Sequence, residues 1–297
     1  MKQKDRLKCI LCKSNKIIKK FVINRFEPQF IIYECKNCGF QFKNPEKVKV
    51  DRYYSRDYYE GRALYSYVDE RKNEKAFRIV WKSRIKKWMN LEKTEVKGKN
   101  FLDVGCSFGG LMLVAKEKGY KAYGVEVSKY SGKYAAKRFG KKYIMIGNIE
   151  KLRLPATFFS IVSLIEVIEH LSNPVKAIQN IYRSLRRGGI LIIQTANMAG
   201  LQARLAGKNY HYYLPGHFSY FSAKNLKQLL KDIGFSKIKI FGGTEFGLLP
   251  KLMKSRYTFR SILDYRHWIR IFLYHYLSKV RIGGLHLTSS MVVICWK

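Results

Sequence analysis

The sequence predicts an open α/β fold in which helices cover both faces of a mostly parallel, seven-stranded sheet, with a small metal-binding domain at the N-terminus. Short apolar segments alternate with amphipathic ones from residue 96 onward. A glycine-rich turn follows the first of these apolar segments, and two Cys-x-x-Cys pairs lie within residues 1–50. With 297 residues and 47% hydrophobic composition, the chain can bury a full core and carry an appendage.

Residues 1–50 contain two cysteine pairs separated by 22 residues: Cys9 and Cys12, then Cys35 and Cys38. This spacing is typical of a zinc ribbon, in which each pair aims two thiolates at one tetrahedral metal. We favour zinc over a disulfide or unligated cysteines, because disulfides do not persist in a reducing compartment. Since four protein ligands leave no open position, we expect this zinc to be structural and to stabilise a segment with little core of its own.

Residues 51–95 are expected to connect the ribbon to the large domain. They begin with a tyrosine-rich run and continue into an amphipathic helical pattern that includes Trp81, Ile85 and Trp88. The tyrosines either form part of a lid over a ligand site or pack the ribbon onto the large domain.

Residues 96–297 are expected to form the large domain. Strands are predicted near 99–104, 121–126, 143–147, 160–165, 190–195, 237–242 and 290–296. Helices are predicted near 110–118, 129–139, 174–186 and 223–233, with the glycines at 188 and 189 ending the third helix. Residues 248–285 interrupt the last strand pair with interleaved basic and aromatic residues, including Arg256, Tyr257, Arg260 and Trp268. This insertion either lies on a membrane or caps a substrate, or it docks on the sheet with its charged ends directed outward.

The most informative segment is residues 101–110, FLDVGCSFGG, followed by Glu126 at the end of the next predicted strand. An apolar strand, a glycine turn and a helix bring the backbone close to a ligand, and Glu126 can accept hydrogen bonds from both hydroxyls of a ribose. Because the turn lacks the full Gly-x-Gly-x-x-Gly spacing, a dinucleotide is the less favoured ligand.

Four motifs appear in order at 102–109 (LDVGCSFG), 124–128 (GVEVS), 165–171 (IEVIEHL) and 185–192 (LRRGGILI). The stretch from about 98 to 247 thereby resembles class I S-adenosylmethionine-dependent methyltransferases, which have a Rossmann-like fold. Within them, 165–171 and 216–222 (GHFSYFS) resemble quinone-biosynthesis O-methyltransferases and sugar methyltransferases. The resemblance implies methyl transfer from S-adenosylmethionine.

The resemblance also implies which residues bind the cofactor. Asp103 and the turn from 105 to 109 would hold the methionine part, Glu126 the ribose, and Asn148 with Ile149 the adenine. The full expected set is Asp103, Gly105, Cys106, Ser107, Gly109, Glu126, Asn148, Ile149 and Glu166. The chain departs from the usual pattern at Asn148, where relatives have aspartate, and at Ser107, where they have glycine.

Two histidines are candidate catalytic bases, because an oxygen or carbon acceptor loses a proton when it is methylated. His217 is favoured over His170, whose motif also joins the sheet edge to the next helix. Gly216 replaces the glutamate of sugar C-methyltransferases, which favours an O-methyl acceptor. Alternatively, Glu166, Glu169, His170 and His217 resemble the Mg²⁺ or Mn²⁺ site of plant-type small-RNA 2′-O-methyltransferases.

The formal net charge is +37, which indicates either an anionic partner, such as RNA or an acidic membrane surface, or a lysine-rich solvated surface. No signal peptide and no apolar stretch of about 18 residues is visible, so we expect a cytoplasmic protein with peripheral membrane contact left open. The favoured function is O-methylation of a small molecule or of a glycan or lipid-linked precursor. The alternatives are an RNA methyltransferase and a catalytically silent binding module.

Overall fold

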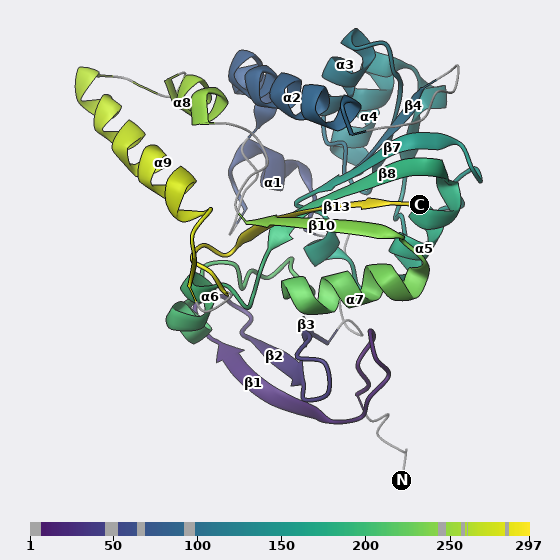
Figure 1. Cartoon of the computed structure of the whole chain (residues 1–297). Coiled ribbons are helices and arrows are strands. Elements are labelled where there is room, and N and C mark those ends of the chain that lie inside the picture. The colour runs from purple at the N-terminus through teal and green to yellow at the C-terminus, as the bar shows by residue number, and fades with distance from the viewer. Residues whose placement is uncertain are drawn as a thin grey trace.

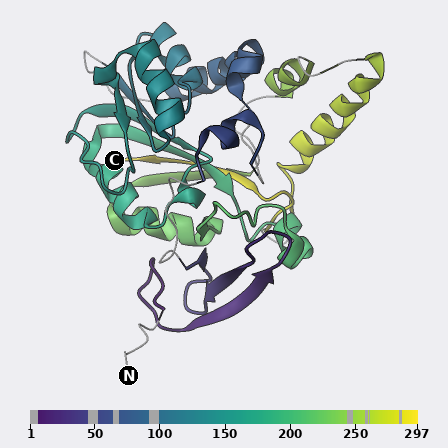
Figure 2. The same ribbon diagram turned by 180° about the vertical axis from the view of Figure 1, so that it is seen from behind.

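The computed structural model of the chain describes residues 7–44, 53–63, 69–91, 99–242, 248–256, 259, 261–282 and 285–297. A seven-stranded sheet forms the body, with helices on both of its faces, and a smaller sheet carries the N-terminal segment (Figure 1). Figure 2 shows the same arrangement from behind. The expected domain boundaries near 50 and 95 lie outside the described residues.

The large sheet confirms the predicted α/β class. Its strands are β10 (Lys237–Gly242), β13 (Ser290–Trp296), β8 (Leu185–Ala196), β7 (Phe159–Ile165), β4 (Asn100–Val104), β5 (Lys121–Glu126) and β6 (Ile144–Ile146), in that spatial order. The ladder from β8 to β6 is parallel, whereas β13 runs antiparallel to both β10 and β8. All seven predicted strands are present, and the sheet is mostly parallel.

Helices pack on each face of the sheet because alternate strand residues point to opposite sides. One face is covered by α2 (Glu74–Met89), α3 (Gly110–Glu117) and α4 (Lys129–Phe139), and the other by α5 (Pro174–Ser184) and α7 (Ala223–Ile233) (Figure 1). Phe101 belongs to the apolar core on the first side, and its neighbour Leu102 to the core on the second.

The third helix, predicted near residues 174–186, ends two residues earlier than expected. Helix α5 ends at Ser184, and Leu185 already pairs with Phe159 of β7 as the first residue of β8. The two glycines lie in an irregular part of that strand, where Gly188 donates to the carbonyl of Lys297 at 2.9 Å and Lys297 donates to Gly189 at 3.0 Å. They therefore lie within β8, beside the C-terminal residue, and do not terminate the helix.

The N-terminal segment is paired with the large domain. Strands β1 (Ile17–Ile23), β2 (Phe30–Cys35) and β3 (Gln41–Lys43) form an antiparallel sheet, whose fourth strand is β9 (Ser219–Tyr220). The rings of Phe40 and Phe221 pack with their centroids 5.1 Å apart. The ribbon thus contacts the segment that contains His217.

The insertion forms α8 (Leu248–Arg256), the 3-10 helix η7 (Ile262–Tyr265) and α9 (Arg266–Leu277), and α9 projects from the body in both views (Figures 1 and 2). The short strands β11 (Arg281–Ile282) and β12 (Leu285–His286) return the chain to the sheet. Tyr257 and Arg260 lie outside the described residues. Within the described part of the chain, we find no helix with the length and hydrophobicity needed to span a bilayer.

Candidate active site

A cavity of about 610 Å³ lies at the carboxyl ends of β4, β5, β7 and β8. Ligands of open α/β sheets bind at this edge. The cavity brings together most residues singled out from the sequence: Asp103, Gly105, Cys106, Ser107, Glu126, Asn148, Ile149, Glu166, Glu169, His170 and His217. Gly109 lies outside this lining and is the N-cap residue of α3.

The turn after β4 is held against the end of β5. Gly105 and Cys106 both donate their backbone N–H groups to the carbonyl of Val125, at 2.8 and 3.1 Å. The buried Glu126 carboxylate accepts the backbone N–H of Ser107 and that of Ser128, each at 2.8 Å. The Ser107 hydroxyl is buried and has no hydrogen-bond partner among the described residues, so it could form a hydrogen bond with a polar atom of a ligand.

Two buried carboxyl groups, those of Asp103 and Glu126, line the cavity. Asp103 accepts a hydrogen bond from the Ser163 hydroxyl at 2.7 Å, and burial raises its pKa to about 7. Burial likewise raises the pKa of Glu126, although backbone N–H groups oppose the shift. A bound cation would favour the ionised form of each carboxyl group.

Tyrosines from the connector cover one side of the cavity. Tyr54, Tyr58 and Tyr59 line it, and the Tyr59 hydroxyl lies 3.5 Å from the carboxylate of Glu126. Tyr53 instead packs its ring against Phe218, with the centroids 6.3 Å apart. Three of these rings therefore line the cavity, and one contacts the segment that pairs with the ribbon.

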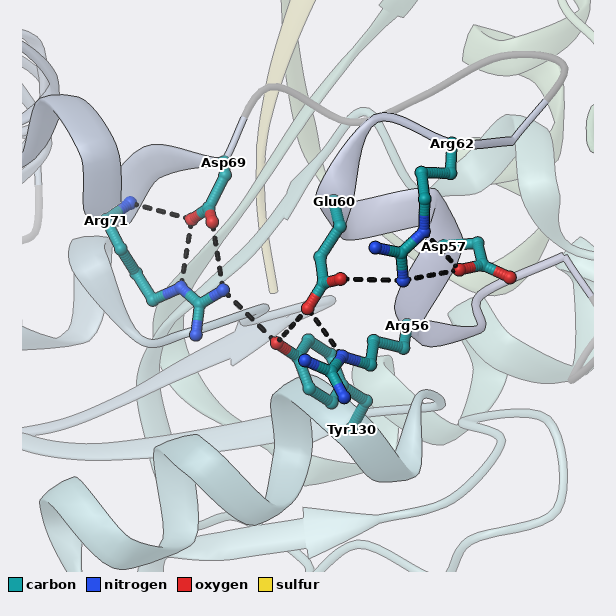
Figure 3. Close-up of polar contacts among 7 residues, drawn as sticks. All are labelled: Arg56, Asp57, Glu60, Arg62, Asp69, Arg71 and Tyr130. Atoms are coloured by element: carbon teal, nitrogen blue, oxygen red, sulfur yellow. Dashed lines mark hydrogen bonds and ion pairs between the residues drawn. The ribbon is translucent and has the colours of Figure 1, made fainter.

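A polar network holds this tyrosine cover on α4 (Figure 3). It joins α1 (Arg56–Glu60) and η3 (Glu70–Asn73) through the hydroxyl of Tyr130, which donates to Glu60 at 3.2 Å and accepts from Arg71 at 3.4 Å. Arg71 also forms a two-point ion pair with Asp69, at 3.0 and 2.9 Å. Arg62 contacts Glu60 at 2.7 Å. Because most of these groups are partly exposed, each pair adds little stability alone, but together they position the cover.

The two candidate bases lie side by side, with ring centroids 4.6 Å apart. Nδ1 of His170 lies 3.0 Å from the carbonyl oxygen of Gly216, and Nδ1 of His217 lies 2.8 Å from that of Tyr212. A carbonyl only accepts, so each Nδ1 carries the proton, and each neutral ring keeps a lone pair on Nε2. Burial lowers the pKa of His170. Burial, together with the charge of the neighbouring His170, holds the pKa of His217 well below its usual value.

Glu169 lies in one cluster with these two histidines. Its carboxylate accepts hydrogen bonds from the hydroxyls of Thr195, at 3.0 Å, and Tyr212. The ligand atoms of Glu169, His170 and His217 all lie within 4.8 Å of one another, a separation that one cation could bridge. Glu166, the fourth member of the expected metal set, is not part of this group.

Glu166 belongs instead to a second polar chain that the sequence analysis missed. The side-chain amide of Gln194 donates to its carboxylate at 2.7 Å, and Arg84 donates to the amide oxygen Oε1 of the same Gln194 side chain. Enclosure in the cavity, and then the charge of Glu169, raise the pKa of Glu166 to about 7. Glu166 has a positive φ of 56°, a strained conformation that is typical of functional sites. Its neighbours Arg84 and Gln194 had only weak sequence signals: a basic residue on an apolar helix face and a polar residue in an apolar strand.

The four N-terminal cysteines form a separate cluster in which all four sulfurs lie within 4.8 Å. Sγ of Cys9 is 3.6 Å from that of Cys38, and Sγ of Cys12 is 3.5 Å from that of Cys35. A tetrahedron with Zn–S bonds of about 2.3 Å has edges of about 3.8 Å. The four thiols therefore fit zinc, as the spacing predicted.

Known proteins resemble this chain over the region of the cavity. A family model described as a methyltransferase domain matches residues 74–240. A tRNA U34 carboxymethyltransferase from Desulfotalea psychrophila is 31% identical over 172 residues, which cover 54% of this chain and 53% of that protein. A ubiquinone biosynthesis O-methyltransferase from Coxiella burnetii is 30% identical over 110 residues, 36% of this chain and 47% of that protein. The chain thus spans about half the length of these curated relatives.

A solved structure has the same fold. The SAM-dependent methyltransferase from Archaeoglobus fulgidus superposes with a TM-score of 0.53 at 21% identity, over 78% of this chain and 100% of that chain. The family match covers more than half of the sequence and includes strands β4 to β8. The chain therefore belongs to the class I S-adenosylmethionine-dependent methyltransferase family.

Proposed function

We propose that this protein transfers a methyl group from S-adenosylmethionine to an oxygen of a small molecule or of a glycan or lipid-linked precursor. The observation that carries the proposal is a single cavity that contains both the donor-side carboxylates, Asp103 and Glu126, and the paired histidines, His170 and His217. Membership of the methyltransferase family supports the choice of donor.

The described residues fit the cofactor. A volume of about 610 Å³ is in the usual range for sites that enclose a ligand of this size. Asp103 would face the positively charged methionine part, Glu126 the ribose hydroxyls, and Asn148 with Ile149 the adenine. The Ser107 hydroxyl offers a further polar contact. When bound, S-adenosylmethionine supplies an electrophilic methyl group on a sulfonium, so the protein mainly positions two reactants and removes a proton.

His217 would take the proton from the acceptor hydroxyl through Nε2. The hydrogen bond between Nδ1 and the Tyr212 carbonyl orients the ring, and burial keeps it neutral. A neutral imidazole can accept a proton without first losing one. His170 lies against it and would orient the acceptor or share the proton.

Calorimetry tests the proposal directly. RNA-free protein is titrated with S-adenosylmethionine at two salt concentrations and then incubated with labelled cofactor and extracts of small molecules and lipids. Saturable binding with label transfer to a metabolite or lipid would support the proposal. An absence of binding would support the silent module instead.

An RNA methyltransferase is the second candidate. It is favoured by the net charge of +37 and by the similarity to a tRNA U34 carboxymethyltransferase. RNA binding releases counterions, so affinity for RNA would fall steeply with salt, whereas affinity for a neutral acceptor would not. Transfer of label to RNA, with this salt dependence, would replace the small-acceptor proposal.

A divalent cation at Glu169, His170 and His217 would change the role of the histidines from bases to ligands. The Nε2 lone pairs, which the hydrogen bonds at Nδ1 leave available, suit either role. Turnover that is lost in EDTA and restored by Mg²⁺ or Mn²⁺ would establish the metal-assisted variant. Turnover that is unaffected by EDTA would favour the proton-transfer role.

A further inference from the structure

One face of helix α9 packs on α8, and this fixes the direction of the other face. Trp268 donates from Nε1 to the Ser255 hydroxyl at 3.0 Å, and Lys251 donates to Nδ1 of His275 at 2.9 Å. Trp268, His275 and Ser278 recur at helical spacing, so they mark the inward face. The opposite face of α9 is exposed.

That outer face is apolar. Ile269, Leu273 and Tyr276 follow one another at intervals of four and three residues, which places them in one stripe on α9. Their side chains are 63%, 51% and 48% exposed, and Val280, which follows the end of the helix, is 41% exposed. Ile262 and Leu263, on η7 just before α9, are also exposed and add to the apolar surface. Scattered apolar residues are normal on a protein surface, but a continuous stripe of this kind marks an interaction site.

Basic residues flank the stripe. Arg266 and Arg270 are exposed along one side of it, and Lys279 is exposed just after the end of the helix. Residues 248–282 contain Asp264 as their single acidic residue against eight basic ones: Lys251, Lys254, Arg256, Arg260, Arg266, Arg270, Lys279 and Arg281. An occupant of this face must therefore be apolar inside and negatively charged at its boundary.

We propose that η7 and the outer face of α9, together the docking surface, bind the interface of an anionic lipid bilayer. Helix α9 would lie along the surface, with its stripe about 5–10 Å deep at the boundary between headgroups and acyl chains and its arginines among the lipid phosphates. A second copy of the chain would bring like charges together. RNA bases stack mainly on aromatic rings and arginine side chains, whereas Ile269 and Leu273 are aliphatic.

The docking surface is linked to the catalytic cavity through α8. Lys254 lines the cavity and lies 3.9 Å from the centre of the Phe77 ring on α2. A membrane bound by α9 would therefore lie beside a wall of the cavity, where a lipid-linked acceptor could enter. Membrane binding itself uses the outer face of α9 and does not depend on the proposed methyl transfer.

Vesicle flotation tests the proposal with RNA-free full-length protein and vesicles of phosphatidylcholine alone or mixed with phosphatidylglycerol. We expect binding to the mixed vesicles. The double variant Ile269→Asp and Leu273→Asp should bind at least about tenfold more weakly, because each substitution removes an apolar side chain from the stripe and adds a negative charge. The matched control is Ile18→Asp with Val22→Asp on β1, which changes two exposed apolar residues and the net charge equally.

The control separates the stripe from general electrostatics, since it should retain binding within about twofold. Arg266→Gln with Arg270→Gln should reduce the preference for the anionic vesicles. Absence of wild-type binding, or equal losses in the aspartate variant and the control, would overturn the proposal. The proposal would also be overturned if the aspartate variant dissociated a dimer, or lost binding to an RNA oligonucleotide, while vesicle flotation was unchanged. Thermal melts verify folding, and Ile269→Ser with Leu273→Ser replaces the aspartate pair if that variant fails to fold.

Discussion

Substitution of Gly105 by alanine tests the tight turn that is central to the proposed cofactor site. Gly105 has a φ of +78°, and a Cβ atom placed there would lie 2.4 Å from Cγ2 of Val167. Gly119 is the matched control, because it has a φ of +85° and nothing within 4 Å of its Cβ position. Gly119 precedes β5, whereas the cavity lies at the far end of that strand.

The two sites should differ by the cost of the clash. A left-handed conformation costs alanine roughly 1–2 kcal/mol, which both variants bear. Overpacking against a stiff valine adds roughly 1–3 kcal/mol in Gly105→Ala alone. We therefore expect the free energy of unfolding to fall by about 1–2 kcal/mol for Gly119→Ala and about 2–5 kcal/mol for Gly105→Ala.

A double-mutant cycle with Val167→Ala isolates the clash. Once Cγ2 is removed, the remaining Cβ of residue 167 is 3.7 Å away, an ordinary contact, so Gly105→Ala should then cost no more than Gly119→Ala. Urea unfolding measures the energies, and calorimetry should show at least tenfold weaker cofactor binding for Gly105→Ala, with none lost in Gly119→Ala. Equal costs for Gly105→Ala in both backgrounds would refute the steric argument.

Three further predictions concern the base, the zinc and the ionisation of the donor site. His217→Ala should reduce turnover roughly 10²- to 10⁴-fold and leave cofactor affinity intact; full turnover would exclude His217 as the base. Cys38→Ser should remove zinc, as measured by metal analysis, and should lower both the melting temperature and the turnover. Turnover should fall because β3 of the ribbon pairs with β9, which lies close to His217 in the chain. Unchanged turnover in zinc-free protein would contradict this coupling. Cofactor affinity should fall roughly tenfold per pH unit below about 7, since burial raises the pKa of Asp103 to about 7 and a cationic ligand binds its ionised form. Asp103→Asn should remove this dependence of affinity on pH. A wild-type affinity that does not change with pH would count against the role proposed for Asp103.

The sheet edge at which the cavity lies could be predicted from the sequence because its signals are local. The strand before Gly105, the turn and the following helix are contiguous, and Glu126 ends the next strand. Parallel strands place their carboxyl ends at one edge, so recognition of the strands was enough to gather these residues. The paired cysteines were readable for the same reason, since each Cys-x-x-Cys pair lies within a few residues of chain.

Contacts between distant segments could not be predicted in this way. No local pattern indicates that Gln194 lies between Arg84 and Glu166, because helix, strand and loop meet only after the sheet has packed. The end of α5 was misplaced because glycines resemble a helix stop, whereas pairing of Leu185 with Phe159 decides the boundary.

The sequence by itself determined the fold class, the sheet edge at which the cavity lies and the fit of four cysteines to zinc, because strand periodicity and short motif spacings are properties of neighbouring residues. Only the tertiary structure decided that the ribbon extends its sheet with β9, that carbonyls set the tautomers of His170 and His217, and that one side of α9 remains uncovered. These features depend on which surfaces and backbone groups meet across the fold, and such long-range pairings are set by the packing of the whole core.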